Sequence, residues 1–301
     1  MQVIPLKYGT MFKQAFSQPD VFCQFVEDIL DIKFNATQIH TEYEYPKPIG
    51  FVRSKYDLFA EDVEQRIIVE IQHVKQDDFF DRFLYYHLIS MVEQVGGCEE
   101  YGFDRTVYTI VVLTSTPRDG TINFSCAISD MNPIDEYDKT IEVYPHRLVF
   151  LCPRQVNDKT PKKIRDWLKF IEDSLDGEMD KNTYPNKLWQ KIIDAIRKQD
   201  IDPELLSEIK DEAAWEKAKK RFITEGKHEG RREGRREGKQ EGRREGRREG
   251  IIDSIQKQLS LKFKSNLPKK YNEKLDAMTL EQLEIVSEKI ITSDTLEEIF
   301  D

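Results

Sequence analysis

The chain has 301 residues, 39% of them hydrophobic and 34% charged, and a net charge of −10. This composition predicts a soluble globular protein with one sizeable core and an accessory region, or two modest domains. The negative total argues against a protein that coats nucleic acid with a large basic surface. The longest apolar runs, such as VYTIVVL, are too short to span a membrane, so no membrane partner is expected.

The amino-terminal segment and the cysteines predict a cytoplasmic protein. The segment MQVIPLKYGTMFKQAF lacks the basic region, apolar stretch and cleavage site of a secretion signal. The cysteines are far apart and mostly in apolar surroundings, which is typical of buried reduced thiols. They are Cys23, Cys98, Cys126 and Cys152.

The first half of the chain alternates helical and strand patterns. Residues 8–30 predict a helix pair, or one helix interrupted near Pro19, and apolar residues along one face predict a helix over 78–95. Runs of β-branched and aromatic residues predict strands at 37–45, 54–61, 66–74, 105–114, 122–128 and 141–151. This order predicts a mixed α/β sheet with helices available to cover both faces.

After Pro153 the pattern becomes helical. Amphipathic segments at 161–175, 186–199 and 203–224 are separated by turns rich in Asp, Pro and Gly. We therefore expect four parts: a first domain of 1–155, a helical region of 156–225, a charged repeat of 226–250 and a helical segment of 251–301.

The charged repeat has glycine at every fourth position from Gly226 to Gly250, and ten Lys/Arg against six Glu. Each glycine costs a helix ~1 kcal/mol relative to alanine, so an isolated helix is marginal here. Two interpretations stay open: a helical spacer stabilised by self-association, which we favour, and a flexible connector. The arginines of the spacer that are expected to reach DNA phosphates are Arg231, Arg232, Arg235 and Arg236. The amphipathic pattern of 251–301 predicts a homo-oligomer through the C-terminal helices.

Polar residues interrupt the otherwise apolar pattern at 54–73. A four-residue loop at 62–65 would pair residue 61 with residue 66, and the same register places Asp57 opposite Glu70 and Lys55 opposite Gln72. Because alternate side chains share one face of a strand, these four residues form one predicted polar cluster.

Two carboxylates at opposed strand positions repel each other. A hard divalent cation such as Mg²⁺ relieves this repulsion, because it binds through one or two carboxylates together with water and phosphate oxygens. A solvated polar face explains the same residues without any metal. Spacing alone leaves both hypotheses open.

Several short sequence motifs, in the same order along the chain, resemble those of one known family. FKQAF at 12–16, DLFAED at 57–62, VEIQ at 69–72 and RFLYYH at 82–87 resemble the recombination-promoting nuclease (Rpn) family, also classed as PD-(D/E)XK nuclease family transposases. The resemblance covers roughly residues 6–150 and extends to the glycine repeat. It implies an α/β PD-(D/E)XK restriction-endonuclease-like core, a mixed sheet flanked by helices, followed by an all-α C-terminal region.

The resemblance also implies an activity and its residues. It implies a Mg²⁺-dependent DNA endonuclease in which Asp57 and Glu70 bind the metal. Gln72 stands where the wider superfamily usually has lysine, and we expect Lys55 to compensate for the missing charge. A second departure is the stretch Tyr8-Gly9-Thr10, where similar sequences often have an acidic residue before the FK word.

Three further residues have two interpretations each. Lys13, Arg82 and Tyr86 are candidates for phosphate contact, and equally for ordinary helix-surface positions whose side chains pack on the protein. Two rival functions also remain: a non-catalytic DNA-binding or assembly protein that keeps a decayed nuclease fold, and a metal-dependent hydrolase of RNA. The uncharged Gln72 favours the first rival, and the opposed carboxylates favour an enzyme.

Overall fold

The computed structural model describes residues 1–46, 54–73, 79–95, 102–115 and 122–300. These residues form two compact units, Met1–Lys217 and Ala218–Asp301. Cys98 of the cysteine prediction lies outside the described residues, and Cys23 and Cys126 are free thiols.

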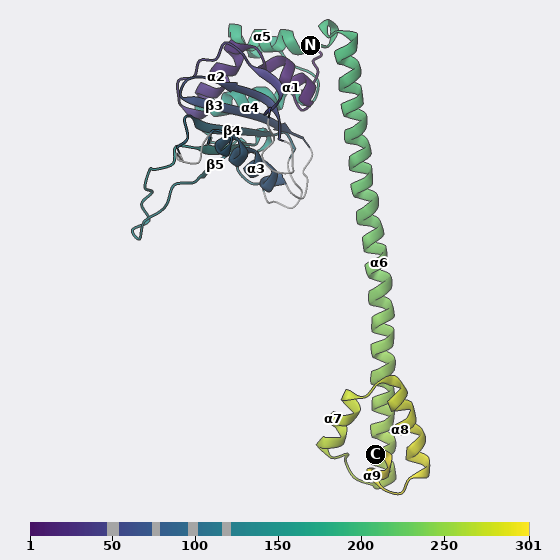
Figure 1. The fold of residues 1–301 in the computed structure, drawn as a ribbon. Helices are drawn as coiled ribbons and strands as arrows, with labels where there is room; N and C mark the ends of the chain where they lie inside the picture. The colour runs from purple at the N-terminus through teal and green to yellow at the C-terminus, as the bar shows by residue number, and fades with distance from the viewer. Residues whose placement is uncertain (47–53, 74–78, 96–101, 116–121, 301) are drawn as a thin grey trace. The chain divides into compact units, whose positions relative to one another are not determined.

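The first unit contains a mixed sheet (Figure 1). Its six strands lie in the order β1-β2-β3-β4-β6-β5. Its strands are β1 (His40–Glu44), β2 (Lys55–Glu61), β3 (Gln65–Gln72), β4 (Thr106–Leu113), β5 (Cys126–Asp130) and β6 (Arg147–Leu151). β1, β2 and β3 are antiparallel neighbours, β4 runs parallel to β3 and β6, and β5 is antiparallel to β6. The predicted mixed α/β sheet is confirmed.

Helices cover both faces of this sheet. They are α1 (Gly9–Phe16), α2 (Pro19–Leu30), α3 (Phe79–Val92), α4 (Lys162–Ser174) and α5 (Lys187–Ile196), with short 3-10 turns η1 (Pro153–Gln155), η2 (Lys181–Thr183) and η3 (Lys198–Asp200). Side chains of α1, α2, α4 and α5 share one core with one face of β2, β3 and β4. Side chains of α3 pack on the opposite face.

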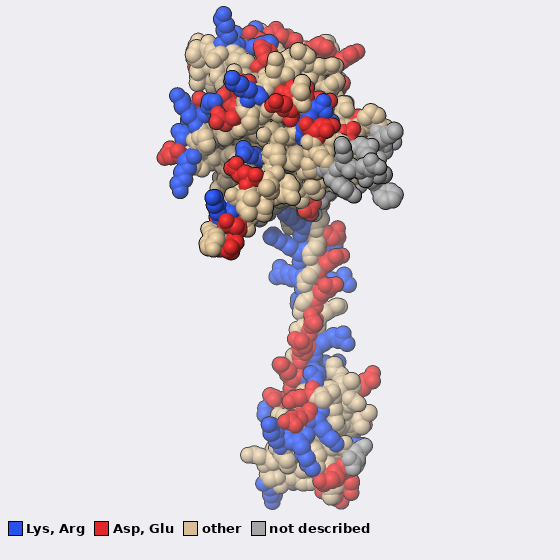
Figure 2. Space-filling model, turned by 60° about the vertical axis from the view of Figure 1, so that its left-hand side comes forward, with Lys and Arg blue, Asp and Glu red and all other residues tan. Residues whose placement is uncertain are grey.

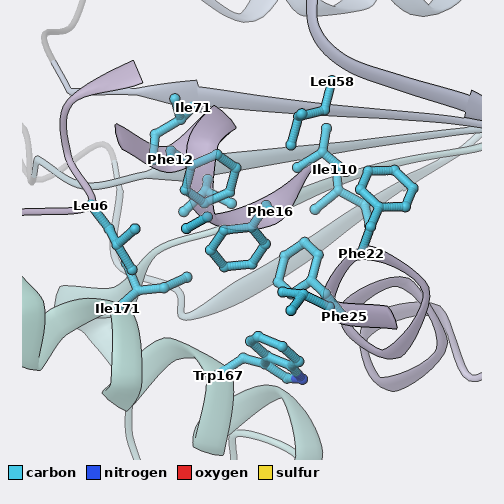
Figure 3. Close-up of a cluster of buried hydrophobic side chains, with 14 of the residues drawn as sticks. Leu6, Phe12, Phe16, Phe22, Phe25, Leu58, Ile71, Ile110, Trp167 and Ile171 are labelled. Carbon is cyan, nitrogen blue, oxygen red and sulfur yellow. The ribbon is translucent and has the colours of Figure 1, made fainter. Parts of the chain in front are cut away.

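Aromatic side chains hold α1 and α2 against α4 (Figure 3). Phe16 and Phe25 meet edge to face with ring centres 5.2 Å apart, and Phe25 meets Trp167 at 5.0 Å. The Trp167 indole N–H donates to Asp28 Oδ2 at 3.0 Å, so the one polar atom of the ring is satisfied. Pro19 at the first turn of α2 separates the helices, because proline fits a helix start and not its interior.

The core of the first unit extends well past residue 155, where we expected the first domain to end. Trp167, Ile192, Ile196 and Ile209 belong to the same buried cluster as the sheet and α1. The compact unit accordingly ends at Lys217, inside the long helix α6 (Pro203–Phe263).

The second unit is helical. The end of α6 packs with α7 (Lys269–Ala277), α8 (Leu280–Thr292) and α9 (Leu296–Phe300) around a small apolar core. The repeat of 226–250 lies within α6, and a Cβ added at any of its glycines would meet nothing within 4 Å in the described chain. Among the described residues, no helix is both long and apolar enough to cross a membrane.

Candidate active site

The predicted pairing of β2 with β3 is present. The two strands pair from Glu61↔Arg66 to Leu58↔Val69, which is the expected register. Every residue of β3 from Arg66 to Ile71 is buried, so this is the central, water-poor strand that the sequence indicated. Tyr56 of β2 packs with Phe59 and Ile68, whereas Leu58 belongs to the cluster on the other face of the sheet.

The backbone pairing of β2 with β3 extends to Leu58↔Val69. At the next residues, the carboxylates of Asp57 and Glu70 accept backbone N–H groups of the opposite strand. The Asp57 N–H donates to Glu70 Oε1 at 3.1 Å, and the Ile71 N–H donates to Asp57 Oδ2 at 3.0 Å. Each carboxylate therefore satisfies a backbone N–H of the opposite strand. We call Asp57 and Glu70, together with the backbone N–H groups that they bind, the fork between β2 and β3. Each carboxylate of the fork is held by a hydrogen bond from the backbone.

Burial makes this pair hard to ionise. Glu70 is only 4% exposed, and burial together with the charge of Asp57 raises its pKa well above the ordinary value. Burial also raises the pKa of Asp57, although the Ile71 N–H and the charges of Lys13 and Arg82 oppose the rise. A cation bound between two such carboxylates would favour the ionised form of both.

Arg82 places a positive charge at Gln72. Its guanidinium, carried by α3, donates to Gln72 Oε1, and its charge also acts on Asp57 and Glu70. Gln72 therefore lies next to a cation although it carries no charge itself. The sequence left Arg82 as either a phosphate contact or an ordinary helix-surface position. Its contact with Gln72 could not be predicted, because the pairing of a helix residue with the end of β3 depends on the tertiary fold.

The Lys55 side chain contacts β1, the neighbour of β2 on the side away from β3. Lys55 pairs with Glu44 across β1 and β2, and its 52% exposed side chain binds Glu42 Oε2. Lys13 of α1 binds the second oxygen of the same carboxylate, Glu42 Oε1. Lys13 and Lys55 therefore meet at Glu42, whereas Gln72, the expected neighbour of Lys55, binds Arg82.

Glu42 is a residue that the sequence did not single out. The pairs Thr41↔Leu58 and Tyr43↔Tyr56 on either side place it opposite Asp57. Its φ of 56° lies in the left-handed region, which costs a non-glycine residue roughly 1–2 kcal/mol. Burial opposes its ionisation, but the hydrogen bonds from Lys13 and Lys55 outweigh burial and lower its pKa.

A polar pocket of about 360 Å³ lies beside Glu42. It is lined by Thr10, Lys13, Gln14, Ser17, Thr41, Glu42 and Glu208. Its walls thus come from α1, β1 and the start of α6, and they consist of hydroxyl, amide and charged groups. Such a lining suits a polar, charged ligand.

The start of α6 contributes two acidic residues next to this region. Glu212 accepts the N–H groups of Gly9 at 2.6 Å and Thr10 at 3.2 Å, which caps the first turn of α1. Glu216 binds His73 Nε2 at 3.0 Å and lies 3.8 Å from Lys7. In the sequence, acidic residues four apart on a helix resemble an ordinary solvated face, so their role was not visible.

The remaining predicted site residues are Tyr86 and the arginines of the repeat. The Tyr86 carbonyl accepts from the Tyr56 hydroxyl at 3.2 Å, and the two rings meet edge to face at 5.5 Å, so Tyr86 packs on the sheet. The arginines of the repeat are exposed, and Arg232 pairs with Glu229 at 2.9 Å. Both basic and acidic side chains line this helix (Figure 2).

The residues present fit a hard divalent cation bound through two carboxylates. Asp57 and Glu70 supply oxygen donors on rigid backbone, and their mutual repulsion is what a cation relieves. Within the described ranges, no group of three or more His, Cys, Asp or Glu side chains could hold a metal ion. A metal here would therefore take its other ligands from water, backbone or substrate oxygens.

Residues 10–224 match the family model described as PD-(D/E)XK nuclease family transposase. The match extends from the first turn of α1 through the sheet and into α6, and so includes every residue of the fork. Neither the curated proteins nor the solved structures gave a match.

Proposed function

The chain belongs to the PD-(D/E)XK nuclease family of transposases, and on that premise we propose that it is a metal-dependent DNA endonuclease of the recombination-promoting type. The observation that carries the proposal is the pair of opposed, buried carboxylates at the fork of β2 and β3. A protein that only binds DNA gains nothing from this costly arrangement, whereas a nuclease uses it to hold a cation.

The proposed cofactor is Mg²⁺ or another divalent cation, held by Asp57 and Glu70. When bound, such a cation activates water and stabilises the leaving oxygen of a phosphodiester. The hydrogen bonds to the opposite strand keep both carboxylates in place without help from the metal. The site is therefore organised before the substrate arrives, which is what electrostatic catalysis requires.

Cationic side chains supply the rest of the proposed site. Arg82 holds Gln72 at the end of β3, so the pair combines an amide with a fixed positive charge. We assign to Gln72 the orientation of the attacking water, and to Arg82 the neutralisation of charge that builds up on the phosphate. Lys13 and Lys55 approach from the β1 side and are assigned to the substrate backbone.

The experiment that tests the proposal is cleavage of supercoiled plasmid by the full-length protein in Mg²⁺, beside an EDTA control and an Asp57→Ala variant. Nicking or linearisation that requires metal and disappears in the variant supports the nuclease. Glu64→Ala is the matched control, because Glu64 is an acidic residue exposed in the hairpin loop away from the fork. DNA binding without cleavage would instead support a non-catalytic binding protein, and cleavage of RNA alone would make the protein a ribonuclease.

A further inference from the structure

Glu42 joins two cations that come from different parts of the fold. Lys13 of α1 binds its Oε1, and Lys55 of β2 binds its Oε2. The carboxylate thus takes one ammonium group on each oxygen, next to Asp57 on the neighbouring strand. No single secondary-structure element would bring these two lysines together.

This arrangement matches the chemistry of a nucleic-acid phosphate. A phosphodiester, like a carboxylate, spreads one negative charge over two oxygens that each accept hydrogen bonds. Exchange of Glu42 for a phosphodiester therefore leaves both ammonium groups paired and the local charge unchanged. Lysine binds phosphate as a point charge and does not require a planar partner, so the same two lysines suit either anion.

The surroundings of Glu42 allow such an exchange. Its side chain is 42% exposed, so the carboxylate has a route to solvent, while Lys13 is held inside the pocket at 17%. The adjoining pocket of about 360 Å³ presents hydroxyl and amide groups that suit the sugar and phosphate oxygens of a nucleic acid. The left-handed backbone at Glu42 indicates that the surrounding structure imposes this position on it.

We propose that Lys13 and Lys55 form a subsite for a DNA backbone phosphate beside the carboxylate pair, and that Glu42 fills this subsite until DNA displaces it. The proposal rests on the proposed function for the nature of the ligand. Glu42 is then a positioning residue: it holds the two lysines at the spacing that one phosphate needs, and it competes with that phosphate.

The test measures binding of a fluorescein-labelled DNA duplex to the full-length protein by anisotropy, in EDTA so that no metal-dependent cleavage occurs. Glu42→Gln keeps the size of the side chain and removes its charge, and it is expected to tighten binding about three- to tenfold. Glu42→Asn serves as a second variant, because asparagine adopts the left-handed backbone more readily than other residues. Glu64→Gln removes the same charge from an exposed position in the hairpin loop, at the end of β2 away from Lys55, and is the matched control.

A variant that lacks both lysines, the lysine background, separates an effect at the subsite from a general effect of charge on DNA binding. In Lys13→Met/Lys55→Met the affinity is expected to fall and Glu42→Gln to have no further effect. The slope of log K against log salt should shrink by ~0.9 for each phosphate that the protein no longer neutralises. Equal tightening by Glu64→Gln and Glu42→Gln, or tightening that persists in the lysine background, would overturn the subsite. So would unchanged affinity in both Glu42 variants.

The outcomes also separate this proposal from the nuclease. If the Glu42 variants bind DNA more tightly through the lysines but no variant cleaves plasmid in Mg²⁺, the subsite stands and the endonuclease does not. If the wild-type protein cleaves plasmid and the Glu42 variants neither bind nor cleave differently from it, the endonuclease stands and the subsite does not.

Discussion

The backbone N–H of Asp57 donates to Glu70 Oε1 at 3.1 Å, although the two residues carry like charges when ionised. A second hydrogen bond joins the same two strands in the opposite direction: the Ile71 N–H donates to Asp57 Oδ2 at 3.0 Å. The carboxylates are thus fixed by the strands that bring them close, and the effect of this arrangement on cleavage and on stability can be measured.

Loss of either carboxylate charge is expected to abolish metal-dependent cleavage. Asp57→Asn and Glu70→Gln keep an oxygen that accepts the backbone N–H, so the fold is retained while a cation loses one charged ligand. We expect the plasmid cleavage rate to fall by roughly 10³-fold or more, since metal-ion stabilisation supplies several kcal/mol. Cleavage at the wild-type rate in both variants would place the chemistry elsewhere.

Ionisation of the pair is expected to destabilise the metal-free protein. The folded-state pKa of Glu70 is raised above its ordinary value of 4.5 by burial and by Asp57, so folding favours the protonated form. This contribution is full at low pH and is lost as pH rises through the raised pKa. In EDTA, the melting temperature of Glu70→Gln should therefore exceed that of the wild type at pH 8, and the gap should close toward pH 4.

Addition of Mg²⁺ gives the complementary result. A cation that binds the folded carboxylates stabilises the folded state by mass action. At pH 8 the wild-type melting temperature should rise with Mg²⁺ concentration, whereas that of Glu70→Gln should rise much less. An equal rise in both proteins would mean that Mg²⁺ binds away from the fork.

We expect the positive charge beside Gln72 to support cleavage from either of two positions, residue 82 on α3 or residue 72 on β3. Arg82→Met removes the charge and should lower the cleavage rate ~10²-fold, the typical cost of losing one charge-stabilising donor. The double variant Gln72→Lys/Arg82→Met moves a cation onto β3 and should recover part of that loss. Gln72→Lys alone brings two cations together next to Phe83 and is not expected to help. If the double variant is no better than Arg82→Met, the charge of Arg82 is not what matters.

The cap that Glu212 forms on α1 is expected to stabilise the first unit. Glu212→Ala leaves the Gly9 and Thr10 N–H groups without this acceptor and should cost about 1–2 kcal/mol, as other helix caps do. Urea unfolding of the full-length protein measures the change. Asp211→Ala is the control, since Asp211 is the exposed neighbour on the same helix, and a similar loss there would contradict the capping role.

Much of the sheet could be predicted from the sequence because its signals are local. A four-residue loop fixes the register of β2 and β3, so the opposition of Asp57 and Glu70 follows from counting residues. The break at Pro19 separates α1 from α2 for an equally local reason. The buried run from Arg66 to Ile71 shows in its composition alone.

The contacts around the carboxylates could not be predicted in this way. Glu42 lies before the connection 45–54 between β1 and β2, and a connection of that length does not determine a register. Arg82 meets Gln72 only because α3 packs on the sheet at a particular angle. Lys55 was placed opposite Gln72 by the register of β2 and β3, whereas its ammonium binds Glu42 of β1. Long-range packing decides all three.

The attachment of α6 limits where the chain can be divided. Ile209 is buried in the core of the first unit, Glu212 caps α1, and Glu216 binds the histidine that follows β3. A fragment that stops at residue 155 would lack all three contacts, together with α4 and α5. Any fragment intended to isolate the sheet for crystallisation or assay should therefore retain the chain through Lys217.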